Sequence, residues 1–380
     1  MRRLLAVLVL MAGLLSGCSR SDNIRIGVLS ISSGPDAYVG QASDLALRDR
    51  VDELNAAGGI AGRKVELVIY DTRGEITEAV AAAHRLIDQD RVDVIIGPSW
   101  SGAAIPIAAI ADEAQVPVIA TTASNPLVTV DEAGAVHPFM FRVCFIDPYQ
   151  GSALADFAYH ELGLRRAGFI TDITSPYSVG IQQFFSERFR ALGGEVVAEE
   201  AYQANETEFR PMLTKVAAAG ADVLMVPSAT YRDIALAARQ AAGLGINIQY
   251  LGVDGWMADD LLAMSGAELE GAYLASGVST EAPRFAEFNA AFSAKHGIQP
   301  SIYAYYALDA LAAIESAYYA AGSYADGPAL AEVLANLKDT ELFTSMVTVD
   351  PATHNPLNKP VEILQVRQGA WVLVKTYTPR

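Results

Sequence analysis

Cysteine is scarce in this sequence. Only Cys18 and Cys144 occur among its 380 residues, so disulfides cannot be the main support of the fold. Cys144 lies in an apolar, strand-like run from Phe139 to Phe145, which favours a buried structural thiol over a nucleophile. The stability of the chain must therefore come from the packing of a hydrophobic core.

Basic residues are also few. Lysine and arginine total 27 against 44 aspartates and glutamates, which gives a formal net charge of −17. So acidic a surface argues against nucleic acid or an anionic membrane face as a partner. With 52% hydrophobic residues and no low-complexity tract, the chain is typical of a compact globular protein, and its length suits two domains.

No enzyme or metal-site motif stands out. Gly58–Lys64 has the glycines of a phosphate loop, but a helix precedes it and Lys64 opens a strand, the reverse of that motif's order. Gly97–Gly102 resembles a nucleophile elbow, yet serine stands at position 101 where that motif needs glycine. The five histidines lack metal-ligand spacing, and no carboxylate pair is evident. We therefore expect no catalytic residue, no metal and no cofactor.

The first residues predict export and anchoring. After a basic start, the apolar run Leu4–Leu15 is too short to span a bilayer stably, and the small residues that lead to Cys18 resemble the lipobox of bacterial lipoproteins. We expect residues 1–17 to be a signal peptide, Cys18 to be acylated, and residues 18–23 to form a lipidated tether. The protein would then be anchored in the periplasm or at the cell surface. The alternative is an ordinary signal peptide with an incidental cysteine.

Short β-branched runs alternate with helical stretches from Asn23 onward. This pattern occurs twice, over residues 24–121 and 167–252, and predicts parallel sheets covered by helices on both faces. After about Gly277, helices follow one another without strands, so they must pack onto a sheet formed earlier. The expected later helices and strands span residues 284–295, 303–321, 329–337, 361–366 and 371–376.

The pattern therefore predicts an α/β protein of two lobes. Residues 24–142 and 277–360 would form the N-terminal lobe, and residues 143–276 and 361–380 the C-terminal lobe. Each lobe would be a doubly wound parallel sheet, and several connecting strands would join the two across a cleft. Sheets of this kind bind ligands at the carboxyl ends of their strands.

Residues at the predicted strand ends could hold a small solute. Gly97–Ala104 ends a strand and opens a helix, so unpaired N–H groups, including that of Gly102, and the Ser101 hydroxyl could receive a carboxylate. Ala120–Pro126 ends the next strand and offers carbonyls and the Ser124 hydroxyl. Asp254 ends a second-lobe strand among apolar residues, where it would be costly without a cation. Serine is also a common helix cap, and aspartate before glycine is a common turn residue.

Two tryptophans flank these positions. Trp100 and Trp256 suit the wall of a pocket for an apolar side chain, although both could be ordinary core residues.

Five motifs together resemble the leucine/isoleucine/valine-binding protein family of ABC importers. They are Ser33–Pro35, Asn55–Lys64, Phe141–Gly151, Tyr177–Gly180 and Arg239–Gly243. The likeness covers essentially the whole mature chain, and the order and spacing of the motifs carry it. The resemblance implies a type I periplasmic binding fold, in which three hinge strands join two doubly wound lobes that close over the solute.

By position, the resemblance assigns roles to five residues. Ser101 would hold the α-carboxylate of the ligand, and Ser124 would bridge its carboxylate and ammonium groups. The Thr122 carbonyl would accept from the ammonium group, Asp254 would pair with it, and Tyr177 would contact the bound ligand. The presence of both the carboxylate site and the acid implies an α-amino acid rather than a neutral amide.

Two departures leave the side-chain specificity open. Trp100 stands where some members have a disulfide cysteine, and the first-loop tyrosine is displaced by one position, as Tyr38. Aromatic residues near the predicted site nevertheless hint at an apolar or aromatic ligand. They are Tyr38, Trp100, Tyr149, Tyr177 and Trp256.

We expect a monomeric, extracytoplasmic lipoprotein that delivers an α-amino acid to the permease subunits of an ABC importer. In this hypothesis the solute docks on Ser101 and Ser124, and the second lobe then swings in with Asp254 and Tyr177. The alternatives are a sensor or carrier of the same fold for a neutral amide or other small organic solute, an enzyme, and a purely structural lipoprotein.

Overall fold

The computed structural model describes residues 23–378. The predicted signal peptide and the predicted acylation site, Cys18, lie outside these residues. No helix in the described range combines the length and the apolar character that crossing a membrane requires.

The first sheet contains five parallel strands in the order β2-β1-β3-β4-β5. Its strands are β1 (Ile24–Ser30), β2 (Val65–Asp71), β3 (Val94–Ile96), β4 (Val118–Ala120) and β5 (Met140–Arg142). β3, β4 and β5 are buried over their whole length. That burial explains the continuous apolar sequence of β3 and β4, because parallel strands are usually covered on both faces.

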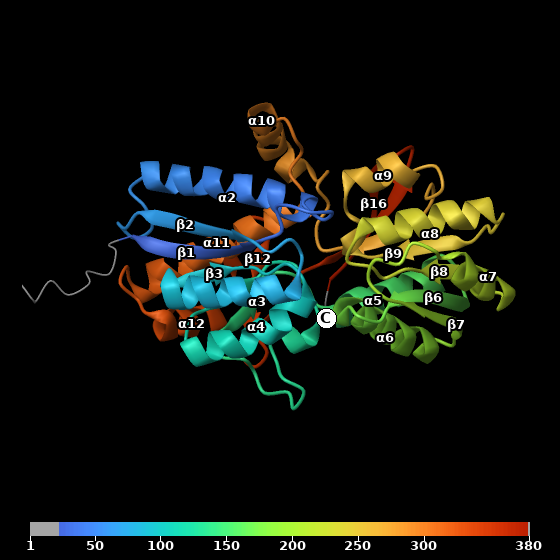
Figure 1. The fold of residues 1–380 in the computed structure, drawn as a ribbon, viewed down its shortest axis with the longest axis horizontal. Helices are drawn as coiled ribbons and strands as arrows, with labels where there is room; N and C mark the ends of the chain where they lie inside the picture. The colour runs from blue at the N-terminus through green and yellow to red at the C-terminus, as the bar shows by residue number, and fades with distance from the viewer. Residues whose placement is uncertain (1–22, 379–380) are drawn as a thin grey trace, which may run out of the picture.

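Helices cover both faces of this sheet. They are α2 (Tyr38–Ala56), α3 (Ile76–His84), α4 (Ser101–Ala114), α11 (Ile302–Ala321) and α12 (Gly327–Ala335). α10 (Ala286–His296) packs outside this layer, in a small buried cluster with residues of α2 and α11. α2 packs against α11, and α3 packs against α4 (Figure 1). α11 comes late in the sequence but is mostly buried within this lobe, so the chain does return to the first sheet.

Short elements complete the first lobe. They are η1 (Arg85–Gln89), η2 (Pro126–Val128), η5 (Pro283–Phe285), β11 (Thr340–Glu341), β12 (Met346–Val347), β13 (Val349–Asp350) and β14 (Asn355–Pro356). The last four strands form two small antiparallel pairs.

The second sheet contains seven strands in the order β16-β15-β10-β9-β8-β6-β7. Its strands are β6 (Arg166–Asp172), β7 (Glu195–Tyr202), β8 (Val223–Met225), β9 (Gln249–Gly252), β10 (Tyr273–Ser276), β15 (Val361–Arg367) and β16 (Ala370–Tyr377). β6 to β10 are parallel, whereas β15 and β16 add an antiparallel hairpin. The hairpin thus adds an antiparallel edge to the predicted parallel sheet. Gln368 and Gly369, both at positive φ, form the tight turn of the hairpin.

Helices also cover both faces of the second sheet. They are α5 (Asp147–Asp156), η3 (Phe157–Glu161), α6 (Pro176–Ala191), α7 (Arg210–Ala218), α8 (Tyr231–Gly243), the short η4 (Asp254–Trp256) and α9 (Asp259–Ser265). α5 packs against α6 in one layer, and α8 packs against α7 and α9 in the other (Figure 1).

The chain passes between the lobes three times, at residues 143–146, 277–282 and 357–360. A buried ion pair fixes the third crossing, because Lys359 Nζ lies 2.7 Å from Asp309 Oδ2 and both side chains are almost fully buried. Lys359 also donates to the Thr344 hydroxyl over 2.6 Å. We propose that the boundaries of the two lobes lie at these crossings.

Candidate functional site

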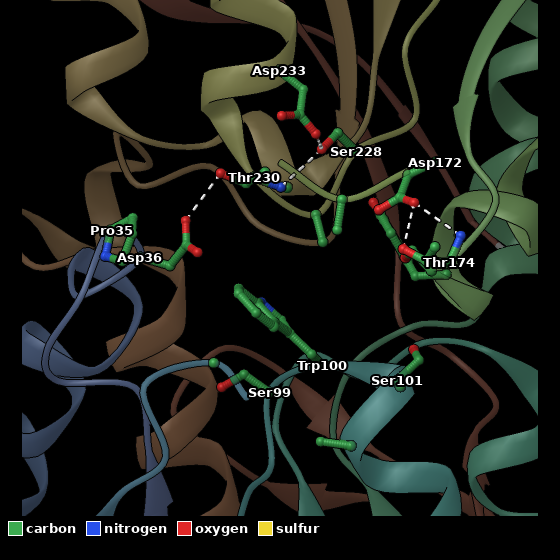
Figure 2. Close-up of a pocket in the computed structure, with 18 of the residues that line it drawn as sticks. Pro35, Asp36, Ser99, Trp100, Ser101, Asp172, Thr174, Ser228, Thr230 and Asp233 are labelled. Atoms are coloured by element: carbon green, nitrogen blue, oxygen red, sulfur yellow. Dashed lines mark hydrogen bonds between the residues drawn. The ribbon is translucent and has the colours of Figure 1, made fainter. Parts of the chain in front are cut away.

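A cleft of about 730 Å³ lies between the carboxyl ends of the two sheets (Figure 2). Loops that follow β1 to β4 line it from the first lobe, and loops that follow β6 to β9 line it from the second. This is the place where open α/β sheets bind ligands. The volume suits a small organic molecule.

The N-terminus of α4 forms part of the first-lobe wall. Trp100 is the N-cap and makes no capping bond with its side chain, while Ser101 and Gly102 begin the helix. Ser101 is therefore not a cap, and N–H groups in this first turn have no carbonyl of their own helix to bond. The Ser101 hydroxyl accepts from the Asn125 N–H over 3.2 Å, which leaves its own hydrogen to donate. This end of the cleft is suited to an anion.

Two residues of the loop after β4, Thr122 and Ser124, were predicted to contact the ligand, and only Thr122 lines the cleft. The Thr122 hydroxyl donates to the Ser99 carbonyl over 2.8 Å. Ser124 is fully buried and does not line the cleft, so the direct ligand contact expected of its hydroxyl has no support in this arrangement. The reason is Arg142, a buried residue of β5 that donates to the carbonyls of Ala123 and Asn125 over 2.9 and 2.8 Å and holds this loop inward.

Asp254 lines the cleft from the second lobe. It is 5% exposed, and its Oδ1 accepts from Gln150 Nε2 over 3.0 Å and from the Tyr177 hydroxyl. Burial raises the pKa of Asp254, and the bonds from Tyr177 and Gln150 offset part of that rise. Sequence reasoning missed the role of Gln150, which also donates to the Ala275 carbonyl and so fixes the carboxylate to the sheet.

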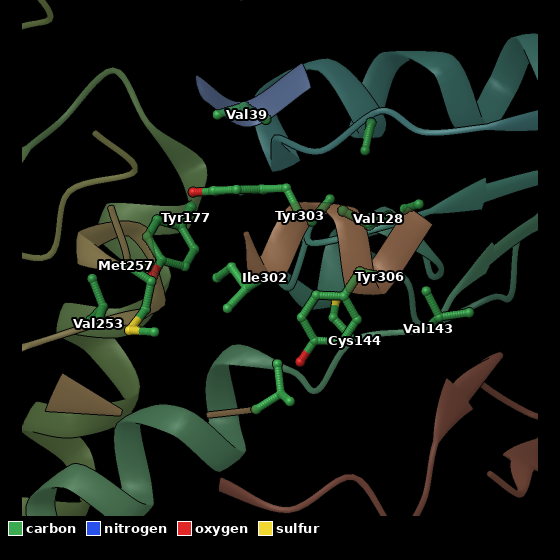
Figure 3. Close-up of a cluster of buried hydrophobic side chains, with 14 of the residues drawn as sticks. Val39, Val128, Val143, Cys144, Tyr177, Val253, Met257, Ile302, Tyr303 and Tyr306 are labelled. Atoms are coloured by element: carbon green, nitrogen blue, oxygen red, sulfur yellow. The ribbon is translucent and has the colours of Figure 1, made fainter. Parts of the chain in front are cut away.

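Trp100 is the aromatic side chain that projects into the cleft (Figure 2). A Cβ atom on Gly74 would lie 2.7 Å from its ring, and Gly74 has φ +79°, so the loop after β2 leaves room for the indole. Tyr177 and Tyr303 also line the cleft. Figure 3 shows both tyrosines at the edge of a buried cluster that includes Cys144 of the first crossing. Burial raises the pKa of the Cys144 thiol to about 12, as expected for a structural cysteine.

Three predicted aromatic residues lie outside the cleft wall. Trp256 is fully buried, packs over Gly252 and donates its indole N–H to the Val226 carbonyl over 3.0 Å. Tyr38 packs edge-on against Tyr231 of the second lobe, with ring centroids 5.0 Å apart, and Tyr149 packs against the core. Pocket-wall roles for these three residues have no support here, because their rings serve the packing behind the cleft.

Sequence reasoning also missed polar side chains of the second-lobe wall. Asp172 accepts from the Thr174 N–H and hydroxyl over 2.9 and 2.6 Å (Figure 2). Asp233 accepts from the hydroxyls of Tyr202 and Ser228 over 2.7 and 2.6 Å. Asp172 ends β6 and Asp233 opens the helix after β8, so the position relative to a strand that identified Asp254 could have identified both.

Carboxylates outnumber guanidinium groups in the cleft wall. The charged residues there are Asp36, Glu75, Asp172, Glu206, Asp233, Asp254, Arg73 and Arg232. Both arginines already have partners, because Arg73 lies 3.1 Å from Glu78 and Arg232 lies 3.1 Å from Asp36. The cleft as a whole therefore favours a solute that carries a positive group.

A polar contact joins the two lobes behind the cleft. Asn125 Nδ2 donates to the Pro176 carbonyl over 2.8 Å, and Asp147 lies fully buried beside it. Burial raises the pKa of Asp147 to about 8. A Cβ atom on Gly180 would lie 2.5 Å from Asp147 Oδ2, so α6 can approach this carboxyl group only with glycine there.

Comparison with known families and proteins gives a consistent result. The family model described as periplasmic binding protein matches residues 23–370. A curated amino acid binding protein of Pseudomonas aeruginosa is 29% identical over 306 residues, which are 79% of each chain.

Solved structures with this fold agree. The leucine binding protein LivK of Thermotoga maritima superposes with a TM-score of 0.86 at 31% identity, over 94% of this chain and 99% of that one. The substrate binding protein LivJ of Streptococcus pneumoniae, solved with isoleucine, superposes with a TM-score of 0.84 at 29% identity, over 94% and 100%.

Proposed function

Because this chain belongs to the periplasmic binding protein family, we propose that it captures an α-amino acid in the interlobe cleft for an ABC importer. Proteins of this family bind solutes for transporters and are not enzymes. The observation that supports the proposal is that an uncapped helix N-terminus of the first lobe and a buried acid of the second lobe line one cleft.

The carboxylate of the ligand would bind at α4. The N–H groups of Ser101 and Gly102 and the Ser101 hydroxyl would donate to it, and the helix dipole would add to the attraction. Three donors of this kind leave little of a carboxylate's charge unpaired when closure of the lobes removes water.

The ammonium group would bind at Asp254. The Thr122 carbonyl would accept from it on the first-lobe side, and Tyr177 would stay bonded to the acid and contact the ligand. A buried carboxylate destabilises the protein unless a cation pairs with it, so the ammonium group of the ligand would supply the positive partner of Asp254. The excess of acids in the wall supports a zwitterion over a plain carboxylate.

The side chain of the ligand would lie against Trp100. Ile76 and Ala103 are among the apolar residues in the cleft wall, which supports an apolar or aromatic side chain. The names of the similar proteins, which describe binding of amino acids and, in one structure, isoleucine, support the same class of ligand.

We also propose that the protein is a monomeric lipoprotein of the periplasm or cell surface that docks on the permease subunits of its importer. Acylation at Cys18 would anchor it. The apolar run before Cys18 and the family of the chain support this part of the proposal.

A thermal-shift screen against the amino acids, their amides and their deaminated acids tests the ligand assignment. Bound ligand stabilises the folded state by mass action, so apolar or aromatic amino acids should raise the melting temperature most. Isothermal calorimetry of the best ligand then measures the Kd. Stronger stabilisation by an amide or a deaminated acid would contradict the proposal and favour a carrier or sensor of such a solute.

A further inference from the structure

One ion pair in the cleft wall joins the two lobes. Asp36 lies in the loop between β1 and α2, and Arg232 lies in the first turn of α8. Arg232 donates to both carboxylate oxygens of Asp36 over 3.1 and 3.2 Å. The Thr230 hydroxyl donates to the same carboxylate over 3.0 Å (Figure 2). Three hydrogen bonds thus tie the first lobe to the second.

This pair differs from the other ion pairs described between residues 23 and 378. Each of the others joins residues within one lobe, or in the case of Lys359 a crossing segment to a lobe. Asp36 and Arg232 are 196 positions apart in the sequence and meet only because the two lobes come together. Their bond energy is therefore available to the closed arrangement alone.

Partial burial of the Asp36–Arg232 pair strengthens the attraction between its charges. The Asp36 side chain is 11% exposed and that of Arg232 is 35% exposed, so water screens the carboxylate only partly. An acid buried to this extent is stabilised by the guanidinium group, and opening of the lobes would exchange these bonds for bonds to water.

We propose that Asp36, Arg232 and Thr230 form an interlobe clasp that stabilises the closed protein and thereby sets its affinity for solute. The effect on affinity rests on the proposed function, whereas the effect on closure does not. A ligand that needs both walls binds the closed arrangement, so its apparent affinity scales with the closed fraction. Asp36 and Arg232 act as positioning residues, because they need not touch the ligand to strengthen its binding.

The experiment compares wild type with Asp36→Ala, Arg232→Ala, the double alanine variant and the charge-swapped variant Asp36→Arg with Arg232→Asp. Glu195→Gln is the matched control, since it breaks an ion pair with Arg166 that lies within the second lobe. Small-angle scattering without ligand measures closure, and calorimetry with leucine measures affinity, each at low salt and at 1 M salt.

Each alanine variant should be more extended in scattering than wild type and bind about five- to tenfold more weakly, the scale of a partly exposed charge pair. The double variant should bind no more weakly than either single variant, and the charge swap should restore part of both closure and affinity. High salt should weaken wild type more than the variants. Glu195→Gln should behave as wild type.

Additive losses in the double variant, or a charge swap no better than the single variants, would overturn the clasp. They would mean that Arg232 or Asp36 acts on the ligand by itself. Scattering curves that are identical for all variants would overturn it as well, even if no amino acid binds. If leucine and the other amino acids fail to bind wild type while the alanine variants still open, the ligand assignment fails and the clasp stands.

Discussion

Replacement of Asp254 by asparagine removes one negative charge from the cleft and almost nothing else. The asparagine Oδ1 can still accept from Gln150 Nε2 and the Tyr177 hydroxyl, so the shape of the wall should persist. Loss of one partner of a buried, hydrogen-bonded charge pair weakens binding by about 2–5 kcal/mol. The Kd for an α-amino acid should therefore rise by about 30- to 5000-fold.

Calorimetry with leucine and with 4-methylpentanoate, which is leucine without its amine, separates the charge from the rest of the ligand. Wild type should strongly prefer leucine, because the deaminated acid leaves Asp254 buried and unpaired. Asp254→Asn should lose most of that preference. Asp259→Asn, an exposed acid five positions away that does not line the cleft, is the matched control and should keep it.

The pH dependence gives a second readout of the same carboxyl group. Burial raises the pKa of Asp254 in the ligand-free protein, and an ammonium group binds only the ionised form. The affinity of wild type for leucine should therefore fall as the pH is lowered through that raised pKa, and Asp254→Asn should lack this fall. An Asp254→Asn variant that binds leucine as tightly as wild type would refute the ammonium site.

Two further predictions concern buried groups outside the cleft. The pKa of Asp147 rises from 3.8 to about 8 on folding, so its contribution to stability is complete below pH 3.8 and is lost as the pH rises to about 8. The melting temperature of wild type should therefore drop more between pH 5 and pH 9 than that of Asp147→Asn. Parallel melting curves for the two proteins would contradict this prediction. Lys359→Met should leave Asp309 buried without its cation and cost about 3–5 kcal/mol in urea unfolding. The double variant Lys359→Met with Asp309→Leu should recover much of that loss, and no recovery would show that packing rather than charge is at stake.

The fold was largely predictable because its strands are short apolar runs that alternate with helices. The resemblance to the leucine/isoleucine/valine-binding protein family is confirmed, and so is the type I periplasmic binding fold. The strand Tyr273–Ser276 and the helices Asp147–Asp156 and Asp259–Ser265 escaped prediction, since they are short and their patterns are weak. The direction of the C-terminal hairpin depends on the turn at Gly369, which the apolar pattern of the strands does not reveal.

The site was predictable to the level of the loop but not of the side chain. Position after a strand led to Ser101, Thr122 and Asp254, which do line the cleft, although their contact with a ligand stays a proposal. Ser124 and Trp256, which were chosen by the same argument, do not line the cleft. A strand end fixes where the backbone goes, whereas the direction of each side chain depends on distant partners such as the arginine of β5.

The interlobe clasp is even harder to predict from a sequence pattern than the cleft side chains are. Asp36 follows a proline in an exposed loop and Arg232 opens a helix, and neither position by itself distinguishes a solvated charge from a bridging one. Because the pair is neutral as a whole, it leaves the excess of carboxylates in the cleft wall unchanged, and the other arginine of the wall is paired with Glu78. The remaining carboxylates then dominate the potential of the cleft. We therefore expect the Asp36–Arg232 pair to act on closure of the lobes, and the excess of carboxylates in the wall to favour a solute with a positive group.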